Sequence, residues 1–282
     1  MRDGYAISSK PTRETNMEQV VRDMVGRSIT EYYPGRTNEP GEIVLEVKNF
    51  CQEGLFNNIS FKLRKGEILG VAGLMGAGRT EIMRALFGVD SCKHGEVYLH
   101  GKKVCIQKPE DAIKAGIGFI TENRKSEGLI LDFSISRNIA LPSVDTFAKR
   151  SVINAKNETA FSEALSKKLG VKTASIDLEA GALSGGNQQK VVIAKCIGMN
   201  PSIIIMDEPT RGIDVGAKRD IYDLMNELTS QGVAIIMVSS ELPEVIGMSD
   251  RILVIHEGKI AGELDHEEAT QEKIITLATG GQ

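Results

Sequence analysis

The sequence predicts an α/β protein whose core is a mainly parallel sheet. The apolar runs SIIIM (202–206) and VAIIMV (233–238) are continuous rather than alternating, which is typical of parallel strands covered on both faces. Segments with helical spacing of apolar residues lie between the predicted strands, and this alternation of element types defines the α/β class. A chain of 282 residues is long enough for one large domain or two small ones.

The elements follow in order along the main part of the chain. Strands are predicted at 42–50 and 58–73, the second interrupted by a Lys-Gly turn, and a helix at 79–88 has Ile82, Leu86 and Val89 on one face. Residues 127–183 have helical patterning and no strong strand, so we expect a helical insertion there. The remaining predictions are strands at 95–101, 117–121, 202–208, 233–240 and 251–260, and helices at 187–198 and 216–231.

The two ends of the chain resemble each other. Segment 2–26 overlays without a gap on 256–280, an offset of 254 positions (256 minus 2), with a turn glycine, a polar stretch and a short apolar helix in each. We therefore expect residues 1–31 to be the tail of a preceding copy of the same domain, 32–42 to be a linker rich in proline and glycine, and 43–282 to be the main domain. Chance similarity is the alternative for so weak an identity.

The composition is that of an ordinary globular protein. The hydrophobic content of 41% and charged content of 26% are ordinary for a globular chain. A net charge of -4 gives no excess of cations, so nucleic acid is not an expected partner. The apolar runs are far shorter than the ~20 residues that span a bilayer, and no secretion signal is recognisable at the N-terminus.

The cysteines and histidines show no metal-ligand spacing. Cys51, Cys92, Cys105 and Cys196 are far apart in sequence, without a C-x-x-C pair. We expect reduced, buried thiols rather than a zinc site.

A glycine-rich loop joins a predicted strand to a predicted helix. The stretch GLMGAGRT (73–80) fits the phosphate-binding pattern G-x-x-x-x-G-K-[ST] except that Arg79 replaces the lysine. Glycines at such a loop allow positive φ, so backbone N–H groups and the helix dipole can converge on an anion. Taken alone, the loop could also be an ordinary strand-to-helix turn. The candidate nucleotide-binding residues are Gly73, Gly76, Ala77, Gly78, Arg79, Thr80 and Glu81.

Three of these side chains have specific expectations. The Thr80 hydroxyl suits Mg²⁺. Arg79 retains a positive charge, but its planar fork is larger than the point charge of an ammonium, so we expect poorer geometry for phosphoryl transfer. Glu81 adds a negative charge beside the anion site and should weaken nucleotide binding; alternatively, it only stabilises the helix N-terminus.

Two adjacent acids end the strand IIIMDE (203–208). Asp207 and Glu208 should lie at the carboxyl edge of the sheet, where ligands of α/β proteins bind. Asp207 is suited to hold Mg²⁺ and Glu208 to orient or deprotonate a water. The alternative is an acidic strand end without a function.

The stretch LSGGNQQKVVIAK (183–195) is the most specific in the chain. Ser184, Gly185 and Gly186 precede a helix and can offer a hydroxyl and free N–H groups to an anion. A simple helix cap is the alternative reading.

Together, LSGGNQQKVVIAK and MDEPTRGIDVGAK (206–218) closely resemble the nucleotide-binding domains of ABC transporters, especially the ATP-binding subunits of bacterial ribose, galactose and xylose importers. The resemblance covers roughly residues 43–282. It implies an antiparallel β subdomain and a helical subdomain at about 127–183 beside the core. Those subunits carry two such domains in one polypeptide, and this chain resembles the second, C-terminal one.

The resemblance also implies roles. Residues 73–80 match the Walker A loop that holds ATP, Asp207 and Glu208 the Walker B acids, and Asp214 the D-loop aspartate at the dimer seam. Ser184, Gly185, Gly186 and Asn187 match the signature that reaches the γ-phosphate on the partner domain. ATP and Mg²⁺ are the implied ligands.

Several positions depart from the family pattern. Arg79 replaces the Walker A lysine, and Asn187 the usual signature glutamine. Glu122 stands where a Q-loop glutamine contacts Mg²⁺, and Ser240 where a switch histidine touches the γ-phosphate. Phe50 is the candidate for stacking on adenine. We expect a degenerate site that hydrolyses ATP slowly, if at all, in a chain whose signature completes the site of the partner domain.

The implied partners are an N-terminal ABC domain of the same polypeptide, a transmembrane permease contacted by the helical insertion and the loop near Glu122, and indirectly an extracytoplasmic sugar-binding protein. The implied location is peripheral, at the cytoplasmic face of the membrane. A soluble ABC ATPase acting on ribosomes or DNA is one alternative, for which basic surfaces and two intact sites are expected. A regulatory module without a catalytic contribution is another. The sequence does not identify the sugar.

Overall fold

The computed structural model describes residues 5–15, 23, 33–35, 38–149 and 152–281. The predicted domain tail at 1–31 therefore lies largely outside the described residues; within it, Thr12–Glu14 form one turn of 3₁₀ helix. The first strand of the main body, β1, begins at Ile43.

A six-stranded sheet forms the centre of the molecule, in the order β12-β11-β3-β10-β9-β6. All neighbours in it are parallel except β12, which runs antiparallel to β11 at one edge. The predicted mainly parallel sheet is thus confirmed. Its strands are β3 (Ile68–Gly73), β6 (Ile117–Ile120), β9 (Ile203–Asp207), β10 (Ala234–Val238), β11 (Arg251–His256) and β12 (Lys259–Asp265).

The central strands are buried on both faces, as the unbroken apolar runs predicted. In β9, Ile203 and Ile205 belong to one hydrophobic core, whereas Ile204 and Met206 belong to the other. Successive side chains of a strand point to opposite faces, so a strand between two cores needs apolar residues at every position.

Helices cover one face of this sheet. They are α6 (Gly185–Ile197), α7 (Val215–Ser230), α8 (Leu242–Met248) and α9 (Gln271–Ala278). Side chains at their starts cap some of them: Asp214 accepts a hydrogen bond from the backbone N–H of Ala217 in α7, and Thr270 from that of Lys273 in α9.

The opposite face packs against helix α2 (Arg79–Phe87), helix α3 (Pro109–Lys114) and a second, antiparallel sheet in the order β2-β1-β4-β5. The antiparallel β subdomain implied by the resemblance is therefore present. Its strands are β1 (Ile43–Gln52), β2 (Phe56–Arg64), β4 (His94–Leu99) and β5 (Lys102–Val104).

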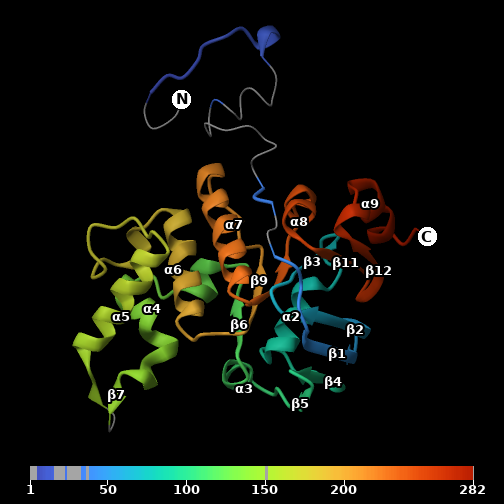
Figure 1. The fold of residues 1–282 in the computed structure, drawn as a ribbon, viewed down its shortest axis with the longest axis horizontal. Helices are drawn as coiled ribbons and strands as arrows, with labels where there is room; N and C mark the ends of the chain where they lie inside the picture. Colours follow the sequence, from blue (N-terminus) through green and yellow to red (C-terminus); the bar gives the residue numbers. More distant parts are fainter. Residues whose placement is uncertain (1–4, 16–22, 24–32, 36–37, 150–151, 282) are drawn as a thin grey trace.

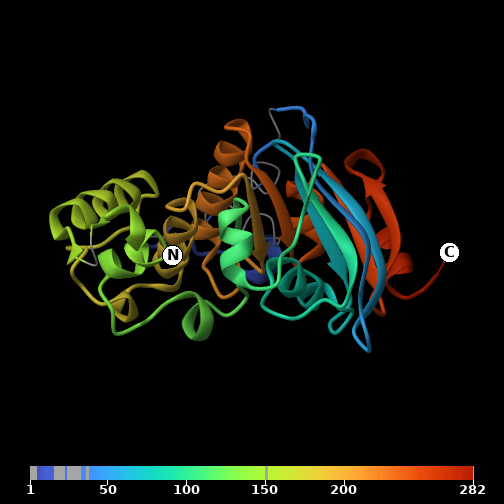
Figure 2. The same ribbon diagram turned by 90° about the horizontal axis from the view of Figure 1, so that it is seen from below.

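The helical insertion lies at one end of the molecule and the antiparallel sheet towards the other, as both ribbon views show (Figures 1 and 2). The insertion contains α4 (Ile135–Ala140), α5 (Ala155–Lys168) and a short hairpin of β7 (Ala148–Lys149) and β8 (Val152–Ile153). It packs on the sheet mainly through α6. Among the helices of the described residues, none has the length and apolar character needed to cross a bilayer.

Two sequence predictions about elements were wrong. The predicted strand at 251–260 is two antiparallel strands, because Glu257 and Gly258 take left-handed φ values of 43° and 71° and reverse the chain. Val89 does not share the buried face of α2, since it lies beyond the helix end and is 42% exposed.

Candidate functional site

The glycine-rich loop connects β3 to α2, as predicted. Gly76 and Gly78 have φ values of 78° and 99°, which favour glycine. The Ala77 N–H donates to the Leu74 carbonyl at 3.1 Å, so the loop closes into a tight turn before the helix starts. Its free N–H groups and the helix N-terminus form the kind of concave site that binds phosphate.

The turn between β11 and β12 supports this loop from behind. The Gly258 N–H donates to the Ala77 carbonyl at 2.9 Å. A Cβ added at Gly73 would overlap the Ile255 carbonyl oxygen, so the loop can approach β11 this closely only with glycine at that position. The sequence showed the phosphate-binding pattern but not this support, because the contact joins segments far apart in the chain.

Arg79 is directed across the sheet edge. Its guanidinium Nη1 donates to the Ser239 carbonyl at 2.9 Å, just beyond the end of β10. The Arg79 guanidinium is therefore held by a hydrogen bond to the chain just after β10.

Asp207 is a buried carboxylate at the end of β9, with 1% of its surface exposed. Neither of its oxygens accepts a hydrogen bond of ordinary geometry from the described residues. Burial raises the pKa of Asp207 to about 6, and Glu208 and Glu81 add to this rise, whereas the Thr80 hydroxyl and Arg79 oppose it. A buried carboxylate without partners, beside a hydroxyl, has the oxygen donors that Mg²⁺ prefers, so the residues present fit this cation.

Glu208 lies next to it in a left-handed backbone conformation with φ of 48°. Its N–H donates to the Val238 carbonyl at 2.8 Å, and the Ser240 hydroxyl donates to its Oε2 at 3.2 Å. Burial raises the pKa of Glu208, while the hydrogen bond from Ser240 and the charge of Arg79 oppose the rise. The structure thus brings Ser240 to the candidate water-orienting carboxylate.

A buried glutamate that the sequence analysis missed links the loops around these acids. Glu244, 1% exposed, accepts hydrogen bonds from the Thr210 hydroxyl at 2.7 Å and from the Ser239 hydroxyl. Thr210 follows the acid pair and Ser239 precedes Ser240, so Glu244 fixes both loops. The sequence analysis predicted no helix at 242–248, so nothing in it pointed to Glu244.

Residues of the signature segment, Ser184–Asn187, form a second cluster at the start of α6. Ser184 is the exposed N-cap residue, and Asn187 Nδ2 donates to its hydroxyl at 3.0 Å. The Lys172 N–H donates to Asn187 Oδ1 at 2.8 Å. A Cβ added at Gly186 would lie 2.6 Å from Ala217 Cβ, which shows how closely α6 meets α7 near Asp214.

Glu122 belongs to this second cluster. Its carboxylate forms an ion pair with Arg211, in the loop between the acid pair and α7. Its predicted contact with Mg²⁺ stays a prediction.

The candidate residues therefore form two groups within the described part of the chain. Residues 73–81, Asp207, Glu208 and Ser240 surround the phosphate loop, whereas Ser184–Asn187, Asp214 and Glu122 lie around the start of α6. No hydrogen bond or ion pair among described residues joins the signature segment to the phosphate loop.

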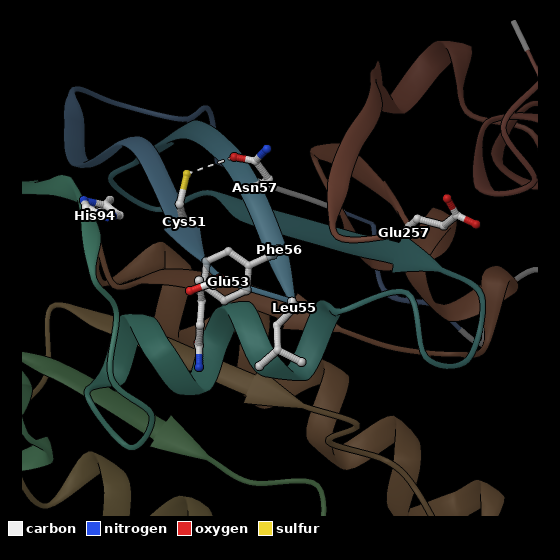
Figure 3. Close-up of a pocket in the computed structure, with 9 residues that line it drawn as sticks. Cys51, Glu53, Leu55, Phe56, Asn57, His94 and Glu257 are labelled. Atoms are coloured by element: carbon white, nitrogen blue, oxygen red, sulfur yellow. Dashed lines mark hydrogen bonds between the residues drawn. The ribbon is translucent and has the colours of Figure 1, made fainter.

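A pocket of about 540 Å³ opens beside the phosphate loop (Figure 3). The Leu55 carbonyl, on its wall, would lie 3.5 Å from a Cβ added at Gly78. Phe50 does not line this pocket: it is 5% exposed and stacks on Phe56 with ring centroids 5.6 Å apart. The predicted stacking of Phe50 on adenine stays a prediction. The labelled lining residues are Cys51, Glu53, Leu55, Phe56, Asn57, His94 and Glu257.

The thiols are free, as expected, but only Cys196 is buried. Cys51 and Cys92 are half-buried and Cys105 is exposed, so the prediction of four buried thiols was wrong. In the part of the chain that the structure describes, no three His, Cys, Asp or Glu side chains form a metal-binding group.

Comparison with known proteins identifies the family. The family model described as "ABC transporter" matches residues 56–211. The ribose import ATP-binding protein RbsA of Oceanobacillus iheyensis is 60% identical over 281 residues, and that of Bacillus subtilis is 60% identical over 282. Each match covers 100% of this chain and 57% of the relative, so the chain spans little more than half of their length.

Solved structures show the same fold. An ATP-binding cassette of an ABC transporter in its ADP conformation superposes with a TM-score of 0.70 at 23% identity, over 84% of this chain and 99% of that one. A dimeric cassette in a post-hydrolysis state with ADP and Pi gives a TM-score of 0.67 at 22% identity, over 79% and 98%. The chain thus belongs to the ABC transporter family and has the fold of its ATP-binding cassettes.

Proposed function

We propose that this chain is the second of two ATP-binding domains in the energy-coupling subunit of a ribose importer. The ribose import proteins that match it at 60% identity are almost twice its length, which leaves room in them for another domain. The similarity between segments 2–26 and 256–280 supports a tandem arrangement with a preceding copy.

The observation that carries this proposal is the separation of the two residue groups. The signature segment lies at the start of α6, without a hydrogen bond to the chain's own phosphate loop among described residues. In this proposal a second domain supplies the signature for this loop, and Ser184 with the N–H groups of Gly185 and Gly186 serves the partner's ATP. The structural relative in a post-hydrolysis state is described as a dimer, which supports such pairing.

The chain's own site is proposed to be degenerate. Thr80 and Asp207 would hold Mg²⁺, which when bound neutralises phosphate charge. Glu208 can orient a water, but Ser240 beside it is short and uncharged, and Arg79 is tied to the Ser239 carbonyl. Poor placement of positive charge where phosphate charge develops slows transfer.

A pair of substitutions tests the degenerate site. Arg79→Lys combined with Ser240→His should raise ATP turnover by the two-domain polypeptide, provided that its other site is inactivated first. Arg137→Lys with Ser230→Ala, both on exposed residues, is the control pair. Brisk turnover by the unmodified chain alone would contradict the proposal.

The signature role has its own test. Ser184→Ala should depress turnover at the partner's site by about a hundredfold or more, the loss expected when one hydrogen-bond donor to the transition state is removed. Ser230→Ala should leave the rate unchanged. A rate unaffected by Ser184→Ala would show that this segment serves no partner site.

We further propose that a membrane permease docks on a mainly apolar groove of about 210 Å³ beside the helical insertion. The subunit would then be a peripheral protein at the cytoplasmic face of the membrane. The sugar-binding protein would contact the permease and not this subunit. Phe119, Thr121 and Met199 line the groove, and Thr121 is adjacent to Glu122. Val89→Glu, on its exposed rim, should weaken binding to permease vesicles while ATP binding persists.

A further inference from the structure

Arg124 joins three segments that are far apart in the sequence. Its Nη1 donates to the Arg211 carbonyl at 2.7 Å and its Nη2 to the Gly212 carbonyl at 3.2 Å. These carbonyls belong to the loop that leads from the acid pair to Asp214. The planar guanidinium thus spans two successive backbone carbonyls, a geometry that suits its fixed fork of donors.

The same guanidinium lies against the signature segment. A Cβ added at Gly185 would lie 2.7 Å from Arg124 Nη2 and 3.1 Å from the Gly212 carbonyl oxygen. The first residue of α6, the Arg124 side chain and the loop at Gly212 are therefore packed so closely that a methyl group at Gly185 would require the guanidinium to move.

A second contact connects two of these segments. The Glu122 carboxylate forms an ion pair with Arg211. Glu122 lies two residues before Arg124, and Arg211 lies one residue before Gly212. Segment 122–124 is thus held to loop 211–212 at two points, one by an ion pair and one by a fork of hydrogen bonds.

The environment of Arg124 is unusual for a surface cation. No carboxylate of the described residues lies within ion-pair distance of it, and its Nε is buried without a hydrogen-bond partner. Partial burial lowers the pKa of Arg124. Partial burial of a cation that only carbonyl dipoles neutralise costs free energy, and a solvent-exposed arginine would not incur this cost.

We propose that Arg124 is a positioning residue that fixes the spacing between the signature segment and the loop at 211–214, so that a displacement of segment 122–124 moves both together. This inference rests on the proposed function of the signature segment. The physical warrant is the shared guanidinium: neither segment can shift relative to the other without breaking one of its hydrogen bonds or opening the contact with Gly185.

The role requires the fork rather than the charge. Lysine would keep the charge but could not span both carbonyls in a fixed plane, and glutamine would keep a donor without the charge. We therefore expect Arg124→Lys and Arg124→Gln to have similar effects. Lys125→Ala, at the adjacent exposed position, is the matched control.

The first measurement needs only this chain. Hydrogen–deuterium exchange of residues 184–190 and 211–217 should become about tenfold faster in both Arg124 variants, since neither side chain can form the two hydrogen bonds together that restrain the segments. Nucleotide affinity at the chain's own phosphate loop should not change, because Arg124 does not contact it. Gly185→Ala displaces the guanidinium from the other side and should produce the same faster exchange at 211–217, with Arg124 intact.

The second measurement uses the two-domain polypeptide. Both Arg124 variants should lower kcat for ATP at the partner's site by about tenfold, which corresponds to about 1.4 kcal/mol in activation free energy, with KM for ATP unchanged. Full activity of Arg124→Lys would overturn the inference, because a charge alone would then suffice. Unchanged exchange at both segments in Arg124→Gln and Gly185→Ala would also overturn it.

These outcomes separate the inference from the proposal on which it rests. If Ser184→Ala leaves the partner's site unaffected, the proposed function fails, whatever the Arg124 variants do. If Ser184→Ala depresses turnover but the Arg124 variants exchange and turn over like the Lys125→Ala control, only the positioning role fails.

Discussion

At the scale of single residues, Asp207 and Glu208 show how neighbouring carboxylates come to lie in different environments. Asp207 ends a fully buried strand with both oxygens unpartnered, whereas Glu208 turns out of the strand at φ 48° and accepts a hydrogen bond from Ser240. The buried carboxylate is costly to ionise in the absence of a cation, and this cost is recovered when a cation binds. The proposed Mg²⁺ site would therefore link stability to ligand binding at Asp207.

Nucleotide binding that depends on Mg²⁺ should weaken as the pH falls through about 6. The pKa of Asp207 is raised to about 6 by burial, and the cation requires the ionised form, so protons and Mg²⁺ compete below this pH. Titration of a fluorescent ATP analogue between pH 5 and 8, with and without Mg²⁺, measures the effect. Affinity that stays constant across this range in Mg²⁺ would contradict the assignment.

Asp207→Asn should stabilise the chain at pH 7 by about 1–3 kcal/mol in the absence of Mg²⁺. Because the pKa of Asp207 is about 6 in the folded state and 3.8 in its ordinary, exposed state, the unfolded state ionises first as the pH rises. The native protein therefore loses stability between about pH 4 and 6 and does not regain it above. Urea unfolding at pH 4 and 7 tests this: the gain from asparagine should be large at pH 7 and small at pH 4. Equal gains at both would show that burial of charge is not the cause.

At the scale of elements, the position of the signature segment depends on how α6 packs on the sheet. Gly118 in β6 faces Cys196 near the end of α6, and a Cβ added at Gly118 would overlap the Cys196 sulfur. The glycine lets the helix lie close to the strand. At the other end of the same helix, Gly186 gives a similar close approach to α7.

Gly118→Ala should destabilise the chain by about 1–3 kcal/mol, because the added methyl group overpacks the contact between β6 and α6. Cys196→Ala removes the opposing sulfur, so the double variant Gly118→Ala/Cys196→Ala should recover most of the loss. A double-mutant cycle from denaturant unfolding gives the coupling energy. If the two effects simply add, the contact does not determine the helix position.

At the scale of the whole molecule, the central sheet separates two hydrophobic cores. One contains α6 to α9, and the other contains α2 and the antiparallel sheet. The four cysteines differ in burial: Cys196 is in the first core, Cys51 and Cys92 are half-buried, and Cys105 is exposed.

Thiol labelling should therefore distinguish the native state from unfolding. Burial raises the pKa of Cys196 to about 12, so this thiol should react only when the first core opens, whereas Cys105 should react at once. The measurement is mass spectrometry of chain alkylated at increasing urea concentrations. Labelling of Cys196 in native buffer, at a rate like that of Cys105, would contradict the packing described.

Motifs with local spacing could be predicted from the sequence. The glycine loop at 73–80, the acids after β9 and the glycines before α6 each depend on a few consecutive residues, as do the buried strands with unbroken apolar runs. The division of 251–260 into two strands and the burial of Phe50 were not foreseen, because a two-residue turn and a packing partner leave little trace in a periodic pattern.

The sequence by itself determined the α/β class and the chemical groups available at each loop, since these follow from residue type and short-range periodicity. Only the tertiary structure decided which groups meet: Arg79 with the Ser239 carbonyl, Glu122 with Arg211, and Arg124 with both Gly212 and Gly185. Such pairs join residues far apart in the chain, and their contact is set by the order of strands in the sheet, which hydrophobic burial over the whole domain selects.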